Sequence, residues 1–489
     1  MKIEFDNSYA RDLSGMYVPW RASGAPKPEL VWLNENLSTD LGLNNTDLRS
    51  PEGVDILSGN KAPDGAQPIA QAYSGHQFGH FAPQLGDGRA LLLGEVIDLQ
   101  GQRKDIAFKG SGRTPFSRGG DGKATLSSVL REVIISEAVQ ALGIPTTRSL
   151  AAVATGETIM RENAVPAGIL TRVAASHLRV GSFEFFAARG DVEPLRRLAD
   201  YAIARHDSSL IEESDRYLLL LQSVIDRQAK LIPQWMGIGF IHGVMNTDNM
   251  AISGETIDYG PCAFMEAYDP NAVFSSIDSQ GRYAYANQPS IAKWNLGRLA
   301  SALMPLIDTD EERAKVLATD AVNAFDYLFA QYSLAVWRAK LGLDATGVED
   351  QKLVTDFLQL MHSHKVDFTQ GWRSLVDAAQ GDDTIFLSLF GTSESVAYWL
   401  EQWHQRSAMQ GIDSASHIAN MKRANPVYIA RNHLVEHALT EAAEHDNLKP
   451  FEALMAVLSQ PFESGAVDSK FADPAPEEVT ACYKTFCGT

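Results

Sequence analysis

The sequence predicts an α+β fold in which a small β-rich lobe with one key helix precedes a larger helical lobe. Two observations support this prediction. Short β-type runs dominate the chain from about residue 67 to residue 174, and beyond about residue 176 apolar residues recur mainly with helical spacing. The chain has 489 residues, of which 45% are hydrophobic and 21% charged. It is therefore long enough to bury a large core in roughly two to four structural units.

The β-rich lobe is predicted from paired runs around one helix. The ranges 90–97 and 103–109 are β-type runs joined by a polar turn, which is typical of a hairpin. Apolar residues from 126 to 142 recur with a period of 3.6 and are followed by Gly143 and Pro145, so we expect an amphipathic helix there. Two further β-type runs are 149–155 and 168–174.

The remaining chain is predicted to be mainly helical, with one short hairpin over residues 249–258. The expected helices cover 194–211, 217–234, 295–306, 311–341 and 430–444. We therefore expect four segments: an N-terminal extension (1–65), the β-rich N-lobe (66–176), the helical C-lobe (177–460) with catalytic and metal-binding loops, and a C-terminal tail with redox cysteines (461–489).

Charge and termini exclude several classes of function. The 42 Lys and Arg residues against 61 Asp and Glu residues give a net charge of −19, which disfavours a nucleic-acid or anionic-membrane partner for the whole chain. No apolar run is long enough to span a bilayer, and the N-terminus lacks a secretory pattern, so we expect a cytoplasmic protein. The three cysteines, Cys262, Cys482 and Cys487, are too few for a disulfide scaffold.

Several short motifs are those of a nucleotide-triphosphate site. Gly86 and Gly88 let a backbone approach phosphate oxygens while Arg89 adds charge, although a Gly-x-Gly turn is more often a plain hairpin connection. Lys109 ends a predicted strand and Glu132 lies on the following helix, as in the lysine–glutamate pair of protein kinases.

The loop between Lys109 and Glu132 is basic and dense in glycine, and it opens onto a helix, which favours an anion site. It does not match a Walker A loop, because Ser117 and Ala124 stand where that motif needs Gly and Ser or Thr. Arg172 and Arg179 flank the expected connector between the lobes. Each is either a surface cation or a phosphate ligand in the cleft.

The second lobe carries a modified catalytic loop. His242-Gly243 and Asn249 resemble the loop of small-molecule kinases, and Asp258 resembles the metal-binding aspartate of that superfamily. Val244 stands where the catalytic aspartate is expected, and Asp248 is the nearby carboxylate. His76 and His80 have zinc-helix spacing, but the glycines around them favour structural histidines.

Together these blocks resemble the selenoprotein O family, also called the YdiU family, over nearly the whole chain. The diagnostic stretches are residues 71–79, 84–89, 109–118 and 242–249, with Asn425-Pro426, Arg431-Asn432 and Cys487 near the C-terminus. The resemblance implies a two-lobed, protein-kinase-like fold. It also implies an enzyme that binds ATP in a flipped orientation and transfers AMP to Ser, Thr or Tyr hydroxyls of proteins.

The resemblance also implies roles for individual residues. Asp248 would accept the proton, Asn249 and Asp258 would hold Mg²⁺ or Mn²⁺, and Lys109 would contact phosphate with Glu132 positioning it. The flipped nucleotide would be lined by Gly86, Gly88, Arg89, Lys109, Asp121, Gly122, Arg172, Arg179 and Asp258.

The resemblance further implies a redox disulfide between Cys262 and a tail cysteine, with Cys487 preferred over Cys482. Thioredoxin- or glutaredoxin-type proteins would then be candidate partners. Three other activities stay open on the sequence: UMP transfer, ordinary phosphotransfer with Asp248 as base, and a non-catalytic nucleotide-binding scaffold.

Overall fold

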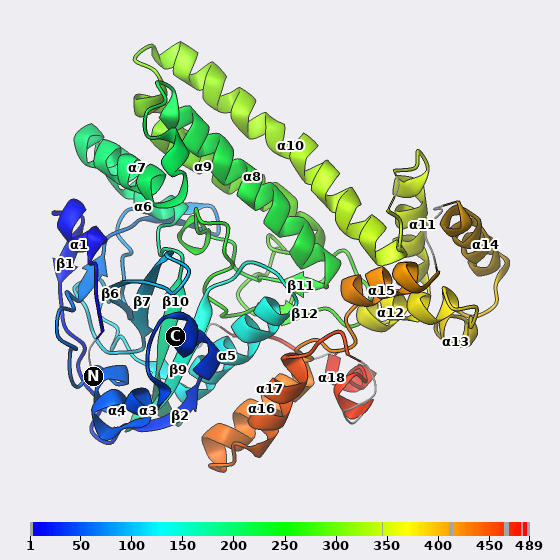
Figure 1. The fold of residues 1–489 in the computed structure, drawn as a ribbon, viewed down its shortest axis with the longest axis horizontal. Coiled ribbons are helices and arrows are strands. Elements are labelled where there is room, and N and C mark those ends of the chain that lie inside the picture. The colour runs from blue at the N-terminus through cyan, green and yellow to red at the C-terminus, as the bar shows by residue number, and fades with distance from the viewer. Residues whose placement is uncertain (1–2, 345, 410–413, 464–468, 481–482, 487–489) are drawn as a thin grey trace.

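The structure is a computed structural model that describes residues 3–344, 346–409, 414–463, 469–480 and 483–486. It confirms the α+β prediction: one antiparallel sheet lies beside a large helical region (Figure 1). The strands in order across the sheet are β1 (Tyr17–Pro19), β3 (Ile69–Gln71), β6 (Ala90–Ile97), β7 (Arg103–Lys109), β10 (Ala164–Ala174), β9 (Arg148–Met160) and β2 (Glu29–Leu33), and β8 (Ala124–Thr125) pairs with β10.

The predicted hairpin of residues 90–109 is confirmed as β6 and β7. In its register Leu92 lies opposite Ala107. Because side chains alternate along a strand, Ile106 and Phe108 join the apolar cluster on one face of the sheet while Ala107 joins the cluster on the other. Both faces of the sheet are therefore covered, which explains why β6 and β7 are mostly buried.

The N-terminal 65 residues supply both edges of the sheet. β1 pairs with β3, and β2 pairs with β9, in antiparallel fashion. The helices of this segment are α1 (Ser8–Asp12), α2 (Glu35–Asp40), α3 (Asn45–Arg49) and α4 (Pro51–Leu57). The segment that reads as an extension in the sequence therefore completes the sheet.

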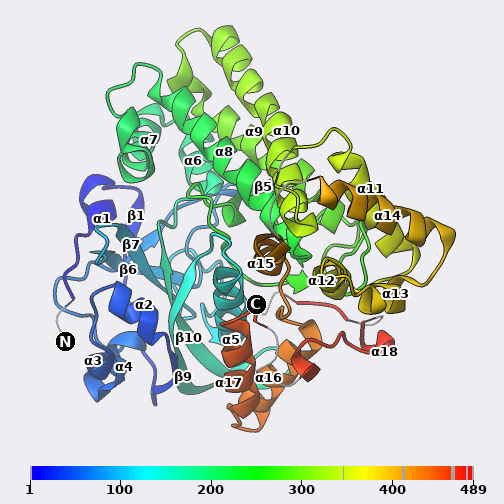
Figure 2. The ribbon, with the colours of Figure 1, turned by 45° about the vertical axis from the view of Figure 1, so that its right-hand side comes forward.

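The predicted amphipathic helix is confirmed as α5 (Leu126–Ala141). The Thr125 side chain caps its first turn by accepting a hydrogen bond from the N–H of Ser128 at 3.1 Å. One side of α5 contacts β9 and β10, and another contacts α16 (Asn432–Glu444) and α17 (Lys449–Leu458), as Figure 2 shows. The helix is thus enclosed, so polar residues on it need partners inside the protein.

The chain beyond residue 176 is mainly helical, as predicted. Its helices before α16 are α6 (Val180–Ala187), α7 (Val192–His206), α8 (Arg216–Gly237), α9 (Gln288–Ile307), α10 (Glu311–Leu341), α11 (Asp350–Ser363), α12 (Phe368–Ala378), α13 (Thr384–Phe390), α14 (Glu394–Ala408) and α15 (Ser414–Ala424). Near the C-terminus lies the short α18 (Glu477–Thr480), and the 3₁₀ turns are Ser208–Leu210, Thr247–Asn249, Tyr285–Asn287 and Ser469–Phe471.

The predicted hairpin over residues 249–258 is wrong. Ala251 forms an antiparallel bridge with Arg179, and Thr256 forms a parallel bridge with Thr146. A local turn does form, with the N–H of Gly254 donating to the carbonyl of Ala251 at 3.3 Å, but the flanking backbone groups pair with other parts of the chain and not with each other. The short pair that does form here is β11 (Phe240–Ile241) with β12 (Ala263–Phe264).

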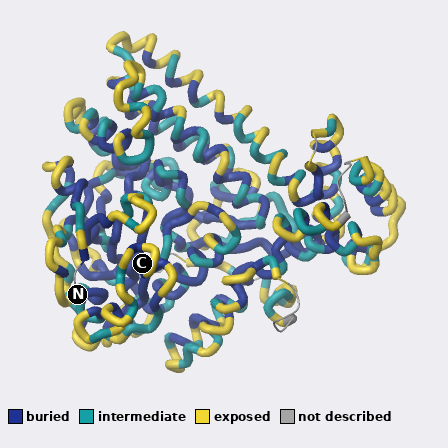
Figure 3. Tube along the Cα trace, viewed as in Figure 1, coloured by how far each residue is buried: buried dark blue, intermediate teal, exposed yellow. Residues whose placement is uncertain are grey.

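Buried residues concentrate on the sheet, on α5 and on the inner sides of the long helices, whereas the outer side of α10 is largely exposed (Figure 3). A separate aromatic cluster, which includes Trp372, Trp399 and Trp403, holds α11 to α15 together. The two-lobed, protein-kinase-like arrangement of the sheet and the helical region stays a prediction.

Candidate active site

Four charged side chains meet between the sheet and α5. We call them the charged cluster: Lys109, Glu132, Arg172 and Asp258. Lys109 Nζ lies 2.5 Å from Glu132 Oε2 and 2.9 Å from Asp258 Oδ1. Arg172 Nε donates to Glu132 Oε1 at 2.7 Å, and Arg172 Nη2 donates to Asp258 Oδ1 at 3.2 Å. Two cations are therefore held by two carboxylates in a buried site.

Strand register explains why the cations of the charged cluster meet. Lys109 is the last residue of β7, and Arg172 on β10 lies opposite Ala107, two residues before Lys109. Residues two apart on a strand share a face, so both cations point to the face that α5 covers. Glu132 lies on the buried part of α5 and reaches both.

Electrostatics keep Asp258 ionised. Burial alone would raise the pKa of its carboxyl, but Lys109, Arg172 and Arg89 outweigh that effect and hold the pKa well below its ordinary value. Asp258 also has a backbone φ of 66°, a left-handed conformation that is uncommon for residues other than glycine. Such conformations cluster at functional sites, where the surrounding structure enforces them.

The glycine turn before β6 is fixed by Asp87. Its Oδ2 accepts the N–H of Gln71 at 2.9 Å, and burial raises the pKa of this carboxyl. A Cβ built on Gly86 would lie 2.4 Å from Cγ of Phe116, and Gly86 has a φ of 72°, so the turn admits only glycine there. Arg89 is close enough to influence the pKa of Asp258, which brings this turn near the charged cluster.

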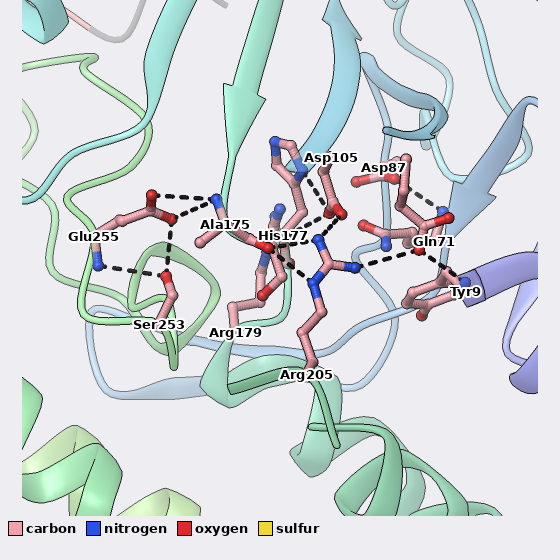
Figure 4. A network of polar contacts seen from close by, with 12 residues as sticks. Tyr9, Gln71, Asp87, Asp105, Ala175, His177, Arg179, Arg205, Ser253 and Glu255 are labelled. Atoms are coloured by element: carbon pink, nitrogen blue, oxygen red, sulfur yellow. Dashed lines mark hydrogen bonds and ion pairs between the residues drawn. The ribbon is translucent and has the colours of Figure 1, made fainter. Parts of the chain in front are cut away.

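Arg179 is held by a chain of buried polar groups (Figure 4). Its Nε donates to the carbonyl of His177 at 3.1 Å, and its guanidinium lies 4.3 Å from the centroid of the Tyr73 ring. The N–H of His177 donates to Asp105 Oδ2 at 2.8 Å, and Arg205 donates to the other oxygen, Oδ1, at 2.6 Å. Burial lowers the pKa of His177.

The sequence argument missed this supporting network. The signal was present in the strand pattern, because residues 105, 107 and 109 share one face and Asp105 therefore belongs on the Lys109 side of β7. Partners such as Arg205, about 100 residues away, follow only from the tertiary fold. Asp105 and Arg205 are candidate positioning residues for Arg179.

The predicted catalytic loop lies between β11 and the Ala251–Arg179 bridge. His242 bonds through Nε2 to the carbonyl of Ile257 at 3.0 Å, which ties this loop to the segment before Asp258. Val244 is buried, and its carbonyl accepts the side-chain N–H of Asn249 at 3.1 Å. His242 is thus a structural residue of the loop.

Asp248 has a carboxylate oxygen, Oδ1, that is buried without a hydrogen-bond partner among the described residues. Burial raises the pKa of this carboxyl to about 6. A Cβ built on Gly75 would lie 2.4 Å from that oxygen, so Gly75 makes room for it. The sequence argument did not identify this contact, which joins β4 (Gly75–Gln77) to the catalytic loop.

Two further residues that were predicted to line the nucleotide, Asp121 and Gly122, have the contacts described for them outside the charged cluster. Asp121 is exposed, pairs with Arg161 at 2.8 Å and accepts the N–H of Lys123 at 2.9 Å. Gly122 has a φ of 69°, and a Cβ there would lie 2.2 Å from the carbonyl oxygen of Gly112. Both belong to the glycine-dense loop before α5: Gly122 packs against Gly112 of the same loop, and Asp121 ties the loop to Arg161 after β9.

His76 and His80, whose spacing resembles that of a zinc helix, do not form such a pair. The two residues lie on the antiparallel β4 and β5 (His80–Ala82), and not on a helix. His76 Nδ1 pairs with Glu184 Oε1 at 2.6 Å. In the parts of the chain that the structure describes, no group of three or more His, Cys, Asp or Glu side chains is arranged to hold a metal.

The donor set nevertheless fits Mg²⁺ or Mn²⁺ bound together with a nucleotide. These ions prefer oxygen ligands and usually take only one or two carboxylates, with water and phosphate completing the shell. Asn249 uses its amide N–H for Val244, which leaves its oxygen for another partner, and Asp258 stays ionised with its side chain 32% exposed.

Cys262 is buried, and burial raises the pKa of its thiol to about 12. The described end of the tail lies beside it, because Thr485 Oγ1 donates to the carbonyl of Pro261 at 2.8 Å and Thr485 pairs with Ser275. Cys482 and Cys487 lie outside the described residues.

Comparison with known proteins identifies the class first: the chain is an enzyme, a nucleotidyltransferase. A family model described as "Protein adenylyltransferase SelO" matches residues 1–459, and the chain belongs to that family. A Cereibacter sphaeroides protein named "Protein nucleotidyltransferase YdiU" is 54% identical over 490 residues, covering 100% of both chains. Proteins of the same name from Chromobacterium violaceum and Mycobacterium sp. are each 52% identical, covering 97% and 100% of this chain and 99% of each relative.

Membership of the selenoprotein O family, predicted from the motifs, is thereby confirmed. Within the described residues, no helix has the length and apolar character that crossing a membrane requires.

Proposed function

We propose that this protein transfers AMP from ATP to hydroxyl side chains of other proteins. The charged cluster is the observation that carries the proposal. Two buried cations beside a glycine turn suit a polyphosphate, since phosphate oxygens would otherwise be costly to desolvate. Val244 occupies the position where a kinase needs its base, which disfavours ordinary phosphotransfer.

The proposed nucleotide site combines these cations with the glycine turn. Lys109 and Arg172 would bind phosphate oxygens, with Glu132 orienting both side chains. Arg89, Arg179 and the backbone at Gly86 and Gly88 would bind the rest of a nucleotide in the flipped orientation that the family resemblance implies, with Asp121 and Gly122 at the loop that covers it.

The reaction balances as a nucleophilic displacement. An acceptor hydroxyl oxygen attacks the α-phosphorus, the bond from that phosphorus to the bridging oxygen breaks, and pyrophosphate leaves. Asp248 would receive the hydroxyl proton, because its buried Oδ1 has no hydrogen-bond partner among the described residues. Asn249 and Asp258 would hold Mg²⁺ or Mn²⁺, which when bound supplies positive charge to the phosphates.

The test uses ATP labelled at either the α- or the γ-phosphate, with Mg²⁺ or Mn²⁺. The acceptors are the protein itself and dephosphorylated casein. We expect protein-bound label from the α position only, and loss of that label in Asp258→Ala. Asp320→Ala, which removes an exposed aspartate on α10, is the matched control and should label normally. Label from the γ position alone would restore ordinary kinase chemistry, and α-labelled UTP as the better donor would indicate UMP transfer.

We also propose that oxidation joins Cys262 to Cys487. Thr485 is held beside Pro261, the residue before Cys262, and Cys487 follows Thr485 by two residues in the sequence. Two thiols would lose two protons and two electrons to a disulfide oxidant, and a thioredoxin-type dithiol would reverse the step. Intact-mass peptide mapping after oxidation should find the Cys262–Cys487 link, and its absence would refute the proposal.

A further inference from the structure

The hairpin of β4 and β5 is attached to the loop that carries Asp248. The N–H of His76 donates to Thr247 Oγ1 at 2.7 Å, and the N–H of Phe78 donates to Asn246 Oδ1 at 3.1 Å. Both acceptors directly precede Asp248 in the sequence. The hairpin therefore forms one border of the place where an acceptor hydroxyl would lie.

The shape of this hairpin is enforced by its surroundings. Its connecting residues, Phe78 and Gly79, have φ values of 51° and 83°, both in the left-handed region. That conformation is unusual for a bulky residue and is kept only where contacts enforce it. The Phe78 ring lies 5.1 Å from that of Tyr283, whose hydroxyl donates to Asn246 Oδ1 at 2.6 Å. The hairpin is thus anchored to the catalytic loop on the side of Phe78.

The outer side of the hairpin continues into a layer of aromatic and cationic groups. We call it the hairpin surface, and it consists of His76, Phe81, Arg282, Trp294 and Arg298. The His76 ring lies 4.9 Å from that of Phe81 and 5.2 Å from that of Trp294. The guanidinium groups of Arg282 and Arg298 lie 5.0 and 5.1 Å from the Trp294 ring centroid.

This surface is accessible to a partner. Phe81 is 40% exposed, which is unusual for a phenylalanine, and both arginines and Trp294 are half-buried. Trp and Arg are among the residues that contribute most to protein interfaces, because they combine large contact area with directed polar groups.

The two arginines of the hairpin surface have no carboxylate as an ion-pair partner among the described residues, although His76 of the same surface pairs with Glu184. The two cations of the charged cluster are paired with carboxylates, whereas neither Arg282 nor Arg298 forms an ion pair with a carboxylate within the described ranges. Both also have an Nε atom that is buried without a hydrogen-bond acceptor there. In a chain of net charge −19, two such arginines on the same Trp294 ring form a local cationic site.

We propose that the hairpin surface docks an acidic segment of the protein substrate next to the hydroxyl that receives AMP. Carboxylates would pair with Arg282 and Arg298, and an apolar side chain of the substrate would pack on Phe81 and Trp294. The inference rests on the proposed function for the identity of the partner. RNA is the other polyanion that arginines and aromatic rings bind, and the experiments below separate it from an acidic peptide.

The first experiment measures binding separately from catalysis. Two fluorescein-labelled peptides carry a central Ser-Thr-Tyr sequence flanked by glutamates in one and by lysines in the other. We expect the glutamate peptide to bind at least about tenfold more tightly in fluorescence anisotropy, and its affinity to fall as salt rises. Arg282→Glu/Arg298→Glu should reverse that preference toward the lysine peptide.

Two further variants control for structure and for net charge. Arg282→Gln/Arg298→Gln keeps most of each stem, so it should abolish the preference for glutamate even if the charge-reversed variant does not fold. Lys422→Glu/Arg423→Glu on α15 changes the net charge by the same amount at another exposed site and should retain the preference. ATP affinity should be equal in all variants.

The second experiment measures transfer of α-label from ATP to the same peptides. Loss of kcat/KM for the glutamate peptide in the Arg282/Arg298 variants supports the docking role. If the wild-type protein transfers no α-label but binds the glutamate peptide through these arginines, the proposed function fails while the docking surface stands. Equal binding of both peptides, tighter binding of a single-stranded RNA oligonucleotide, or full binding by the glutamine variant would overturn the inference.

Discussion

Gly75 lies directly against the carboxylate of Asp248. A Cβ at position 75 would come within 2.4 Å of Asp248 Oδ1 and 2.8 Å of Leu85 Cδ1, so Gly75→Ala must displace one or both. Asp248 is the proposed proton acceptor, and misplacing a catalytic group by about 1 Å can cost about 100-fold in rate. We therefore expect Gly75→Ala to lower kcat for AMP transfer by about that factor, measured with α-labelled ATP, while ATP affinity stays unchanged.

Gly297 provides the matched control for this residue. It lies in α9, and a Cβ there would meet nothing within 4 Å. Gly297→Ala should keep full activity and raise stability by roughly 0.5–1 kcal/mol, because glycine in a helix interior is less stable than alanine.

Asp248→Asn should lower kcat by about 10²- to 10⁴-fold. A Gly75→Ala protein with normal kcat would show that the position of Asp248 does not matter to the reaction.

At the scale of elements, Glu255 joins the end of β10 to the segment that leads to Asp258. Its carboxylate accepts the N–H of Ala175 at 2.9 Å and the hydroxyl of Ser253 at 3.0 Å (Figure 4). Burial raises the pKa of this carboxyl from 4.5 to about 7. Between these values the folded protein keeps a proton that the unfolded chain releases, so this group lowers stability as pH rises.

Glu255→Gln should remove that pH dependence. Below pH 4.5 the Glu255 carboxyl is protonated in the folded and in the unfolded protein, and above pH 7 the stability that wild type loses as pH rises has been lost completely. Relative to wild type, the variant should therefore gain about 3 kcal/mol in free energy of unfolding between pH 4.5 and pH 8. Urea unfolding followed by tryptophan fluorescence at both pH values measures this gain. Glu255→Ala should show the same pH trend from a lower baseline, because it also loses the acceptor for Ala175. If the free energy of unfolding of Glu255→Gln differed from that of wild type by the same amount at both pH values, the raised pKa of Glu255 would be contradicted.

The elements also show what the sequence alone can predict. The β6–β7 hairpin, α5 and α10 were predictable because local alternation, helical period and breakers agree with the final fold. The segment 249–258 looked equally local, but its backbone pairs with Arg179 and Thr146. The edge positions of β1 and β2 were also hidden, because short edge strands have little pattern of their own.

The same distinction applies to the candidate site. Lys109, Glu132 and Asp258 were singled out from motif spacing, and the structure brings them together. For Arg172 the sequence left a surface cation and a cleft ligand equally open, and the register of β10 with β7 places it in the cluster. Asp105 with Arg205 depends on contacts about 100 residues apart, for which no local pattern exists.

At the scale of the whole molecule, one fully buried arginine binds to three distant parts of the chain. Arg431 precedes α16, and its guanidinium pairs with Glu266 and with Asp367, the N-cap of α12. Its Nη2 also donates to the carbonyl of Ala472 at 3.0 Å. The segment after β12, the helical region and the approach to the tail therefore converge on this side chain.

Arg431→Met should destabilise the protein as a whole. Removing one partner from a buried ion pair leaves uncompensated charge and typically costs about 3–5 kcal/mol. We expect a loss of that size in the free energy of unfolding, measured by urea at neutral pH. Arg313→Met, which removes a 72% exposed arginine paired with Asp308, is the control and should change stability little.

The triple variant Arg431→Met/Glu266→Gln/Asp367→Asn separates charge from packing. If the cost of Arg431→Met comes from two buried carboxylates without their cation, making both neutral should recover more than half of the lost stability, because no charge then remains to be desolvated. The Asp367→Asn change keeps the cap of α12, since an asparagine side chain can accept the same N–H of Gln370. If the triple variant were no more stable than Arg431→Met, the junction would depend on the guanidinium's hydrogen bonds, including that to Ala472, and not on charge balance.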